Sequence, residues 1–360
     1  MTPDRDFAAL AARITAWGHE LGFGAVGISG TDLGAEEVRL LNWLALGRHG
    51  EMDYMARHGV RRARPAALVP GTIRVITARL DYWPARARRA DEVLADSHRA
   101  YVSRYALGRD YHKVLRSRLA TLAQHIEDDV GPFGYRVFTD SAPVLEVALA
   151  TRSGLGWRGK HTLLLSRDAG SYFFLGEIYT NLPLPVTPAV SAHCGSCSAC
   201  IAACPTGAIV APYELDATRC ISYLTIELKG SIPEALRPLI GNRVYGCDDC
   251  QLACPWNRHA VATTTEDFDA VRNGLDDASL TTLFAWTEDE FLRNTEGSAI
   301  RRIGHERWSR NIAVALGNAA PAPEIVAALE RRANDRSSLM REHVAWALAR
   351  QREAAAQPRA

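Results

Sequence analysis

The sequence predicts a chain in three parts: a mixed α/β (α+β) N-terminal domain, a ferredoxin-type cysteine module and a helical, HEAT-like C-terminal segment. Three observations support this division. Strand-like and helix-like patterns alternate over the first half of the chain. All eight cysteines lie between Cys194 and Cys254. An Ala- and Arg-rich tail with helical spacing follows. We therefore expect domains at residues 1–185, 186–258 and 259–360.

The composition is that of a cytoplasmic globular protein. The 360 residues are 47% hydrophobic, which is enough for two or three domains with their own cores. Lys and Arg total 42 against 41 Asp and Glu, so net charge neither requires nor excludes a nucleic-acid partner. The N-terminus lacks the pattern of an export signal, and no apolar run reaches the length of about 18 residues that a membrane helix needs. We expect a monomer with no membrane partner.

The elements of the N-terminal domain follow from periodicity. Helical spacing covers residues 5–20, 31–46 (with an Asp or Thr cap), 111–128 and 143–150. Apolar or β-branched runs predict strands at 23–28, 73–80, 135–138, 161–165 and 171–179. Three prolines within 182–188 mark a linker to the cysteine module.

The C-terminal part is predicted to be helical. Residues 262–297 are acidic and mixed in character. From Ile300 onward, apolar residues recur at helical spacing, as in Ile312, Leu316, Ile325 and Leu329. Two or three antiparallel helices fit this pattern, in the manner of a partial HEAT-like repeat.

The first cysteine motif carries the most specific signal. Residues 194–205 read C-x2-C-x2-C-x3-C-P, and a second, split copy consists of Cys220 followed by residues 247–255. In two-cluster ferredoxins this run supplies three thiolates to one [4Fe–4S] cluster, and its fourth cysteine binds the other cluster. The predicted ligands of the first cluster are Cys194, Cys197, Cys200 and Cys254. Those of the second are Cys204, Cys220, Cys247 and Cys250.

Zinc sites and a disulfide framework are the alternatives. Zinc sites favour paired C-x2-C knuckles rather than three cysteines in seven residues followed by a cysteine–proline pair. Disulfides belong to exported chains, and the export signal is missing. The iron–sulfur interpretation is therefore preferred.

Asp140 is a candidate proton donor. It follows a predicted strand and precedes Ser141-Ala142-Pro143, a strand-to-helix turn that exposes a carboxyl group at a cleft. A carboxylic acid with a raised pKa can donate a proton at such a place. The alternative is an N-cap for the helix that opens near Pro143.

Basic clusters are candidate contacts for RNA phosphates. One group lies early in the chain: Arg57, Arg61, Arg62, Arg64, Arg86, Arg88 and Arg89. The other combines cationic or titratable side chains with an aromatic one: Arg301, Arg302, His305, Arg307, Trp308 and Arg310. Such runs usually form a solvated face, but an interleaved aromatic also suits base stacking.

Several motifs outside the cysteines give the chain a family resemblance. They are SRYALGRDYHKVLR (103–116), FTDSAPVLE (138–146), GLGWRGKHTLLL (154–165), CISYLTIELKG (220–230), IGNRVYGCDDCQLACPWN (240–257) and EGSAIRRIGHERWSRNIAVALGN (296–318). With these segments, which span nearly the whole chain, the sequence resembles the epoxyqueuosine reductase family, cobalamin-dependent oxidoreductases that complete queuosine in tRNA.

The resemblance implies a reaction and its cofactors. Epoxyqueuosine at the wobble position of tRNAs for Asp, Asn, His and Tyr, which have QUN-type anticodons, would be reduced to queuosine with loss of oxygen as water. Electrons from an external low-potential donor would pass singly through two [4Fe–4S] clusters to base-off cobalamin, cycling between its cob(II) and cob(I) states. Asp140 would donate a proton, and Arg301, Arg302, Arg307 and Arg310 would contact tRNA.

The resemblance also implies a corrin-binding set. Its members are Arg62, Ser103, Arg104, Tyr105, Asp140, Lys160, Leu164, Leu175, Ser222 and Tyr223. Hydroxyls and backbone groups suit the amide side chains of a corrin, although each residue has an alternative role in the core or at the surface. His112 is either a structural histidine, which we favour, or a cobalt ligand, which a base-off mode argues against.

Two other functional classes compete with this interpretation. A ferredoxin-type electron carrier has no need of a large domain before its clusters. A reductive dehalogenase-like enzyme acting on a small molecule usually carries a twin-arginine export signal, which this N-terminus lacks.

Overall fold

A four-stranded sheet organises the N-terminal part of the chain in the computed structural model, which describes residues 6–356. Its strands are β1 (Ala25–Ser29), β2 (Arg74–Asp81), β4 (Tyr135–Thr139) and β7 (Phe173–Thr180). The order is β1-β2-β7-β4, and every neighbouring pair is antiparallel. This pairing gives the predicted mixed domain the α+β form, because α/β domains are built on parallel strands.

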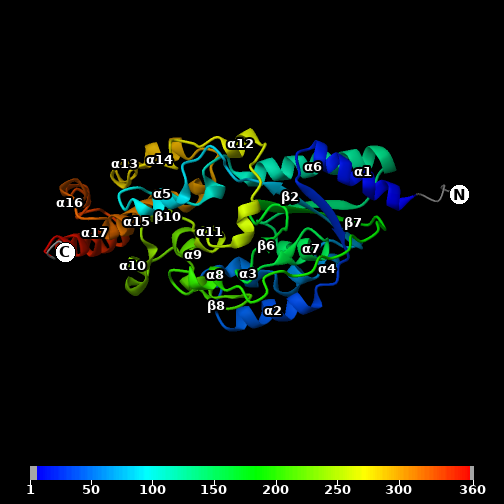
Figure 1. The fold of residues 1–360 in the computed structure, drawn as a ribbon, viewed down its shortest axis with the longest axis horizontal. Coiled ribbons are helices and arrows are strands. Elements are labelled where there is room, and N and C mark those ends of the chain that lie inside the picture. The colour runs from blue at the N-terminus through cyan, green and yellow to red at the C-terminus, as the bar shows by residue number, and fades with distance from the viewer. Residues whose placement is uncertain (1–5, 357–360) are drawn as a thin grey trace.

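Helices cover both faces of this sheet. Because successive side chains of a strand point to opposite faces, Ile76 and Ile178 pack toward α1 (Phe7–Glu20) and α6 (Tyr111–Val130). Val75 and Tyr179 pack on the other face, toward α7 (Glu146–Arg152). Figure 1 shows α1 and α6 together on one side of the strands and α7 on the other. The two central strands are therefore buried almost throughout.

Smaller elements connect the sheet to the cysteine module. Helices outside the sheet layers are α2 (Gly34–Ala45), α3 (Asp53–Arg57), α4 (Pro65–Leu68), α5 (Ala90–Ala95), α8 (Ala199–Ala202), α9 (Ile221–Ile226), α10 (Arg237–Ile240) and α11 (Asp249–Leu252). The short strands form three two-stranded pairs: β3 (Tyr101–Val102) with β10 (Arg243–Tyr245), β5 (Trp157–Arg158) with β6 (Leu164–Leu165), and β8 (Ile209–Ala211) with β9 (Glu214–Leu215).

Most predicted elements occur in the structure, with three local corrections. The strand predicted at 161–165 is only β6, paired with β5. The helix predicted at 143–150 begins at Glu146, because residues 139–144 form tight turns. The helix predicted at 31–46 has Leu33 at its N-cap, and Asp32 instead accepts a hydrogen bond from the Gly34 amide at 3.0 Å. Residue 5 of the first predicted helix lies outside the described residues.

The C-terminal part is helical, as its periodicity predicts. Its helices are α12 (Glu266–Asp269), α13 (Leu280–Phe284), α14 (Glu288–Asn294), α15 (Gly304–Asn318), α16 (Pro323–Glu330) and α17 (Ser338–Ala356). The central helix α15 packs against α13, α16 and α17. Figure 1 places α16 and α17 at the end of the molecule opposite α1. The HEAT-like character of this segment stays a prediction.

The C-terminal core includes a segment from the first half of the chain. Ala100, Val102 and Leu107 belong to the same buried cluster as Trp308 and Ile312 of α15. This segment leaves the sheet after β2 and returns to it through α6. Within residues 6–356, no helix combines the length and apolar character needed to cross a membrane.

Candidate active site

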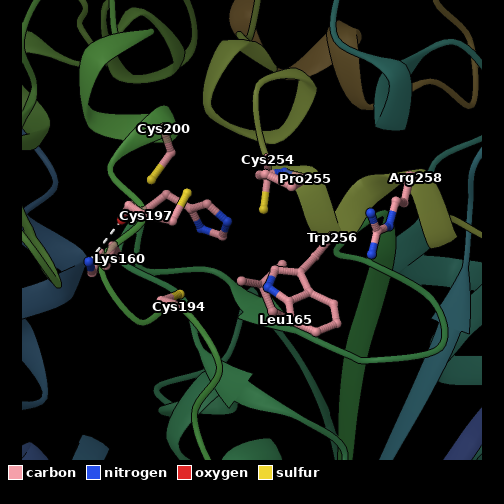
Figure 2. Close-up of a pocket in the computed structure, with 10 residues that line it drawn as sticks. Lys160, Leu165, Cys194, Cys197, Cys200, Cys254, Pro255, Trp256 and Arg258 are labelled. Atoms are coloured by element: carbon pink, nitrogen blue, oxygen red, sulfur yellow. Dashed lines mark hydrogen bonds between the residues drawn. The ribbon is translucent and has the colours of Figure 1, made fainter.

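Four cysteines from two distant stretches of the chain line one cavity of about 210 Å³. They are the set predicted for the first cluster: Cys194, Cys197, Cys200 and Cys254. Figure 2 shows Cys254 facing the other three across the cavity. His161, Leu165 and Trp256 complete its wall. The fold therefore brings a cysteine of the second motif to the three of the first, as crossed ligation requires.

The four cysteines of the second predicted set are each partly buried. Burial raises the pKa of the Cys250 thiol well above its usual value, and Cys220, Asp248, Cys200 and Cys204 raise it further. Burial likewise raises the pKa of Cys247, with Asp249 and Cys220 contributing. Cys250 is thus influenced by two members of its own predicted set and by Cys200 of the first. All eight cysteines are free thiols.

The crossing follows from a local geometry that occurs twice. Helices α8 and α11 pack against each other, and each ends two residues before a cysteine–proline pair. The Cys204 amide donates to the Ile201 carbonyl at 3.3 Å, and the Cys254 amide donates to the Gln251 carbonyl at 3.1 Å. Each cysteine therefore leaves its short helix beside the other motif.

No three His, Cys, Asp or Glu side chains within residues 6–356 share the close spacing of a single-ion site. A [4Fe–4S] cluster has a different requirement, since its four cysteine ligands bind four separate irons around a larger body.

The second cysteine motif anchors the segment that contains Ser103. Asp248, which is 2% exposed, accepts hydrogen bonds from the Tyr101 hydroxyl at 2.7 Å, the Ser103 hydroxyl at 2.6 Å and the Arg104 amide at 2.8 Å. β3 pairs with β10 in the same region. Residues 101–104 are therefore fixed directly beside Cys247 and Cys250.

Asp140 lies in a hydrogen-bonded group at the start of α6. The His112 Nε2 atom is 2.7 Å from one Asp140 oxygen, and the His112 Nδ1 atom is 2.7 Å from the Asp110 carboxylate. The Tyr111 hydroxyl donates to the other Asp140 oxygen. Since α7 begins at Glu146 with Leu145 at its N-cap, Asp140 does not cap that helix. The alternative interpretation as an N-cap is therefore wrong.

The protons in this group are arranged differently from the sequence-based expectation. Burial alone would lower the pKa of His112, but the hydrogen bonds that its ring donates to the Asp110 and Asp140 carboxylates raise it to about 9. Burial raises the pKa of Asp140, yet the bonds and charge of His112, with help from Tyr111, leave it below its ordinary value. The expected raised pKa of Asp140 is therefore corrected: in this arrangement His112 holds the proton.

Two further acids lie close to Asp140. Burial and the Asp140 charge raise the pKa of Glu146. Glu177, on the central strand β7, is fully buried, and neither of its oxygens has a partner within the described structure. Burial raises its pKa well above the usual value, with Glu146 and Asp140 adding to the effect. Both glutamates therefore favour the neutral, protonated form.

Arg62 closes this group on one side. Its side chain is 5% exposed and donates to the carbonyl oxygens of Tyr54 at 2.9 Å and Ala142 at 3.3 Å. Burial lowers the pKa of Arg62, and the charges of Tyr54 and Glu146 act in the opposite direction. Arg62 therefore ties the loop that carries Asp140 to α3.

The predicted corrin-binding residues come from several elements of the fold. Ser103 and Arg104 lie at Asp248, and Tyr105 lies between Tyr111 and Tyr245, with ring centroids 6.1 Å from each. Ser222 and Tyr223 come two and three residues after Cys220, and the Tyr223 hydroxyl accepts from the Glu51 amide at 2.8 Å.

Three members lie elsewhere. Leu164 and Leu175 are core residues of one buried cluster. The Lys160 ammonium donates to the carbonyl oxygens of Gly195 at 2.7 Å and Cys197 at 2.8 Å, which places it at the loop of the first cavity.

The predicted tRNA contacts divide into two groups. Arg301 and Arg302 are exposed, and Arg302 pairs with Glu227 and contributes to the charge around Asp140. Arg307 is half-buried and donates to three backbone carbonyls. Arg310 is fully buried and donates to the carbonyls of three residues of the 224–230 segment.

These placements correct two predictions. Arg310 is wrong as a tRNA contact because its guanidinium lies inside the protein. Trp308 is wrong as a base-stacking residue because it is fully buried against Trp286 and Phe291.

Sequence reasoning missed several members of the site. Asp110 and Tyr111 were not singled out as partners of Asp140, although the run Asp-Tyr-His at a helix start was a usable signal. Glu177 was hidden within an otherwise apolar strand. Tyr54 was missed because nothing in the sequence links α3 to the Asp140 loop.

Two family models match the chain. Residues 193–257 match a 4Fe-4S double cluster binding domain. Residues 62–141, which include the Asp110–Asp140 group, match a model described as Epoxyqueuosine reductase QueG, DUF1730.

Curated relatives extend the similarity to almost the whole chain. An epoxyqueuosine reductase from Burkholderia pseudomallei is 62% identical over 96% of this chain and 93% of its own length. One from Pseudomonas aeruginosa is 61% identical over 97% and 96%, and one from Escherichia coli is 58% identical over 98% and 92%.

Solved structures show the same fold. A crystal structure of epoxyqueuosine reductase with an epoxyqueuosine-modified tRNA-Tyr stem loop has a TM-score of 0.88 at 27% identity, covering 96% of this chain and 91% of that one. A Bacillus subtilis epoxyqueuosine reductase, described with its catalytic aspartate loop swung out of the active site, has a TM-score of 0.87 at 27% identity with the same coverage.

Proposed function

Because the chain belongs to the epoxyqueuosine reductase family, we propose that it reduces epoxyqueuosine to queuosine at the wobble position of tRNA, with Asp140 as the proton donor. The observation that carries this assignment is the Asp110–His112–Asp140 group, which lies in the same domain as the segment docked on the second cysteine motif. The protein is accordingly an oxidoreductase.

Two [4Fe–4S] clusters fit the cysteine geometry described above, and cobalamin fits the donors beside it. Arg104 is 4% exposed, and its Nε and Nη2 atoms have no partner in the described part of the chain. Guanidinium donors of this kind suit the carbonyl oxygens of corrin amide side chains. Arg104, Ser103, Tyr105 and Ser222 are therefore the residues that would hold the corrin. When bound, cobalamin supplies the low-potential metal centre through which two electrons reach the epoxide.

The chain's own part in the chemistry is to deliver protons. Converting the epoxide to an alkene and water consumes two electrons and two protons. Asp140 receives a proton from His112, 2.7 Å away, and gives it to the departing oxygen. His112 then regains a proton from solvent, so the same pair serves the second transfer. Asp110 on the far side of His112 keeps the imidazole oriented and charged.

The substrate is a tRNA with a QUN-type anticodon. Arg301 and Arg302 are the exposed members of the C-terminal basic run, and Arg302 lies close enough to Asp140 to lower its pKa. Phosphates held there would place the modified base beside the Asp140 carboxyl. The chain would act as a cytoplasmic monomer supplied by an external electron donor.

The decisive experiment replaces Asp140 with Asn. Asn keeps the size of the side chain and loses the acidic proton, so single-turnover reduction should slow by about 10²–10⁴. Reconstituted wild type and Asp140→Asn are incubated with epoxyqueuosine tRNA and a chemical reductant, and the nucleosides are measured by mass spectrometry.

Iron content, cobalamin content and melting temperature of the same samples serve as controls. Queuosine formation by Asp140→Asn at the wild-type rate would assign the proton to another group. No queuosine from the loaded wild type would contradict the proposed reaction itself.

A further inference from the structure

The mouth of the first cysteine cavity carries an unusual set of surface side chains, which we call the entry surface. It consists of Lys160, Arg167, His193, Trp256, Arg258 and His259. Arg167, Arg258 and His259 are exposed, and the other three are half-buried. Lys160, Trp256 and Arg258 also line the cavity itself (Figure 2).

The cations of the entry surface have no acidic partners within residues 6–356. Lys160 donates to backbone carbonyls, Arg167 contacts the His193 ring at 3.2 Å, and Arg258 contacts the His259 ring at 3.0 Å. Most ion pairs elsewhere in the molecule join an arginine to a nearby carboxylate, as in Arg64 with Glu37. No Asp or Glu lines the cavity, and the exposed Asp168 next to Arg167 makes no ion pair. The surface thus carries a local positive excess on a chain whose net charge is only +1.

Aromatic rings join these charges to the cavity. Trp256 lies against Trp157 with ring centroids 5.0 Å apart, and His193 lies 5.0 Å from Trp157. Trp256 also neighbours His259 at 6.2 Å. Aromatic side chains with a polar edge are enriched at protein–protein interfaces, where they provide contact area at low entropic cost.

The first cysteine set is the one that reaches the entry surface. It lines the cavity that Lys160, Trp256 and Arg258 also line, and its Cys197 is exposed, whereas every cysteine of the second set is at least partly buried. The segment around Ser103 is docked at the second set. The first set is therefore the one that a protein partner can approach, and the second set adjoins the proposed corrin site.

We propose that the entry surface is the docking site of an acidic, low-potential electron-carrier protein. This inference rests on the proposed function, which requires an outside source of electrons. Each carrier molecule loses one electron to the chain and leaves oxidised, so two carrier molecules serve one epoxide. Such encounters are brief, bury little area and depend on charge steering, which unpaired cations around a shallow redox site provide.

RNA is the other polyanion that a basic surface attracts. The entry surface borders the first cysteine cavity, whereas the base to be reduced must reach Asp140, whose pKa is lowered by the charge of the exposed Arg302. The aromatic side chains also pack against one another rather than standing free for base stacking. The geometry therefore favours a protein partner.

The test reverses the charges on the exposed part of the surface. Arg167→Glu/Arg258→Glu, loaded with both clusters, is mixed with a reduced plant-type [2Fe–2S] ferredoxin, and cluster bleaching is followed by stopped-flow absorbance. We expect the second-order rate constant to fall by about tenfold or more at low salt, and its salt dependence to flatten, because steering is lost. Reduction by methyl viologen, a small cation, should be no slower than in wild type.

Arg350→Glu/Arg352→Glu on α17 is the matched control, because it makes the same change in net charge at exposed positions of the C-terminal helix. Its reduction by ferredoxin should match wild type. Equal slowing in both double variants, or unchanged kinetics in the entry-surface variant, would overturn the proposal. So would a loss of tRNA affinity with normal ferredoxin kinetics, which would assign the surface to RNA. Queuosine formation with a chemical reductant needs no carrier protein. It therefore tests the proposed function independently of the docking surface.

Discussion

At neutral pH the proton shared by Asp140 and His112 resides on the imidazole. Two carboxylates at 2.7 Å outweigh the effect of burial on His112 and raise its pKa to about 9, while Asp140 remains ionised. Asp140 therefore becomes an acid only by receiving a proton from its neighbour. Each proton that Asp140 donates is therefore drawn from His112.

His112 should make both activity and stability depend on pH. Its folded-state pKa of about 9 lies above the ordinary value of 6.5, so protonated His112 stabilises the fold fully below pH 6.5. That contribution is lost as the pH rises through 9. We expect urea midpoints of wild type to fall over this range, and those of His112→Gln to fall less.

Turnover of the loaded wild type should also decline as the pH rises through 9, since His112 can no longer recharge Asp140. The titratable groups around the His112 imidazole are Asp110, Tyr111, Asp140 and Glu146. Lys113 lowers the pKa of Asp110, and Arg302 lowers the pKa of Asp140. His58→Gln, at an exposed position, is the control. A wild-type stability profile identical to that of His112→Gln would contradict the assignment.

Single residues were predictable from sequence when their neighbours in the chain defined them. Asp140 stood out because it ends a strand, and the cysteines because their spacing matches cluster ligation. The pKa of Asp140 was not predictable, because it depends on His112, which comes from a different element. Arg310 and Trp308 were misassigned because a basic, aromatic run looks the same whether its helix is exposed or enclosed by α9, α13 and α17.

At the scale of elements, the Asp248 carboxylate connects two parts of the fold. Three donors from residues 101–104 converge on it inside the protein. The backbone pairing of β3 with β10 holds the same segment to the residues just before the second cysteine motif.

Replacing Asp248 with Ala should therefore destabilise the protein by about 3–5 kcal/mol, because it leaves buried donors unpaired. The second cluster should be lost preferentially, since Cys247 and Cys250 flank the altered position. Iron content and thermal unfolding measure the two effects. Asp32→Ala, which removes one exposed bond, should change stability little. Normal iron content with an unchanged melting temperature would show that the anchor is dispensable.

Element prediction succeeded where periodicity was long and failed where short turns decide. α6 and the central strands followed from their patterns within two residues. The start of α7 and the N-cap of α2 could not be predicted from periodicity. Local hydrogen bonds, such as that from the Ala142 amide to the Thr139 carbonyl, compete with the first turn of a helix. The antiparallel pairing of the strands could not be predicted from the sequence either, since alternating strands and helices occur with both parallel and antiparallel sheets.

At the scale of the whole molecule, the proposed tRNA contact lies where the C-terminal helices meet the catalytic domain. Arg302 pairs with Glu227 at the end of α9, and Arg301 is bound to the Leu292 carbonyl. Both side chains remain exposed, so they are available to phosphates.

Arg301→Ala/Arg302→Ala should weaken tRNA binding and reduce the salt slope by about one or two, because fewer counterions are released. Binding is measured by fluorescence anisotropy at several salt concentrations. Cluster content should not change. Arg310→Ala serves as a contrast: it should lower the melting temperature, because it removes buried bonds between α15 and the 224–230 segment. An unaltered salt slope in the double variant would place the phosphates elsewhere, with the run at 57–64 as the next candidate.

The arrangement of the three parts was only partly predictable. Composition marks the cysteine module and the helical tail as separate regions of the sequence. The return of Ala100, Val102 and Leu107 into the C-terminal core was not visible, because a short apolar segment carries no information about which core it joins.

The exchange of cysteines between the two motifs has a mechanical consequence. The first cluster would join Cys200 to Cys254 and close one long loop, and the second would join Cys204, Cys220 and Cys247 within that loop. Cross-links that close long loops restrict the unfolded chain most, and two nested ones restrict it from both ends. The two clusters would thus both constrain the chain around residues 205–249, and the loss of either one would destabilise the binding site of the other.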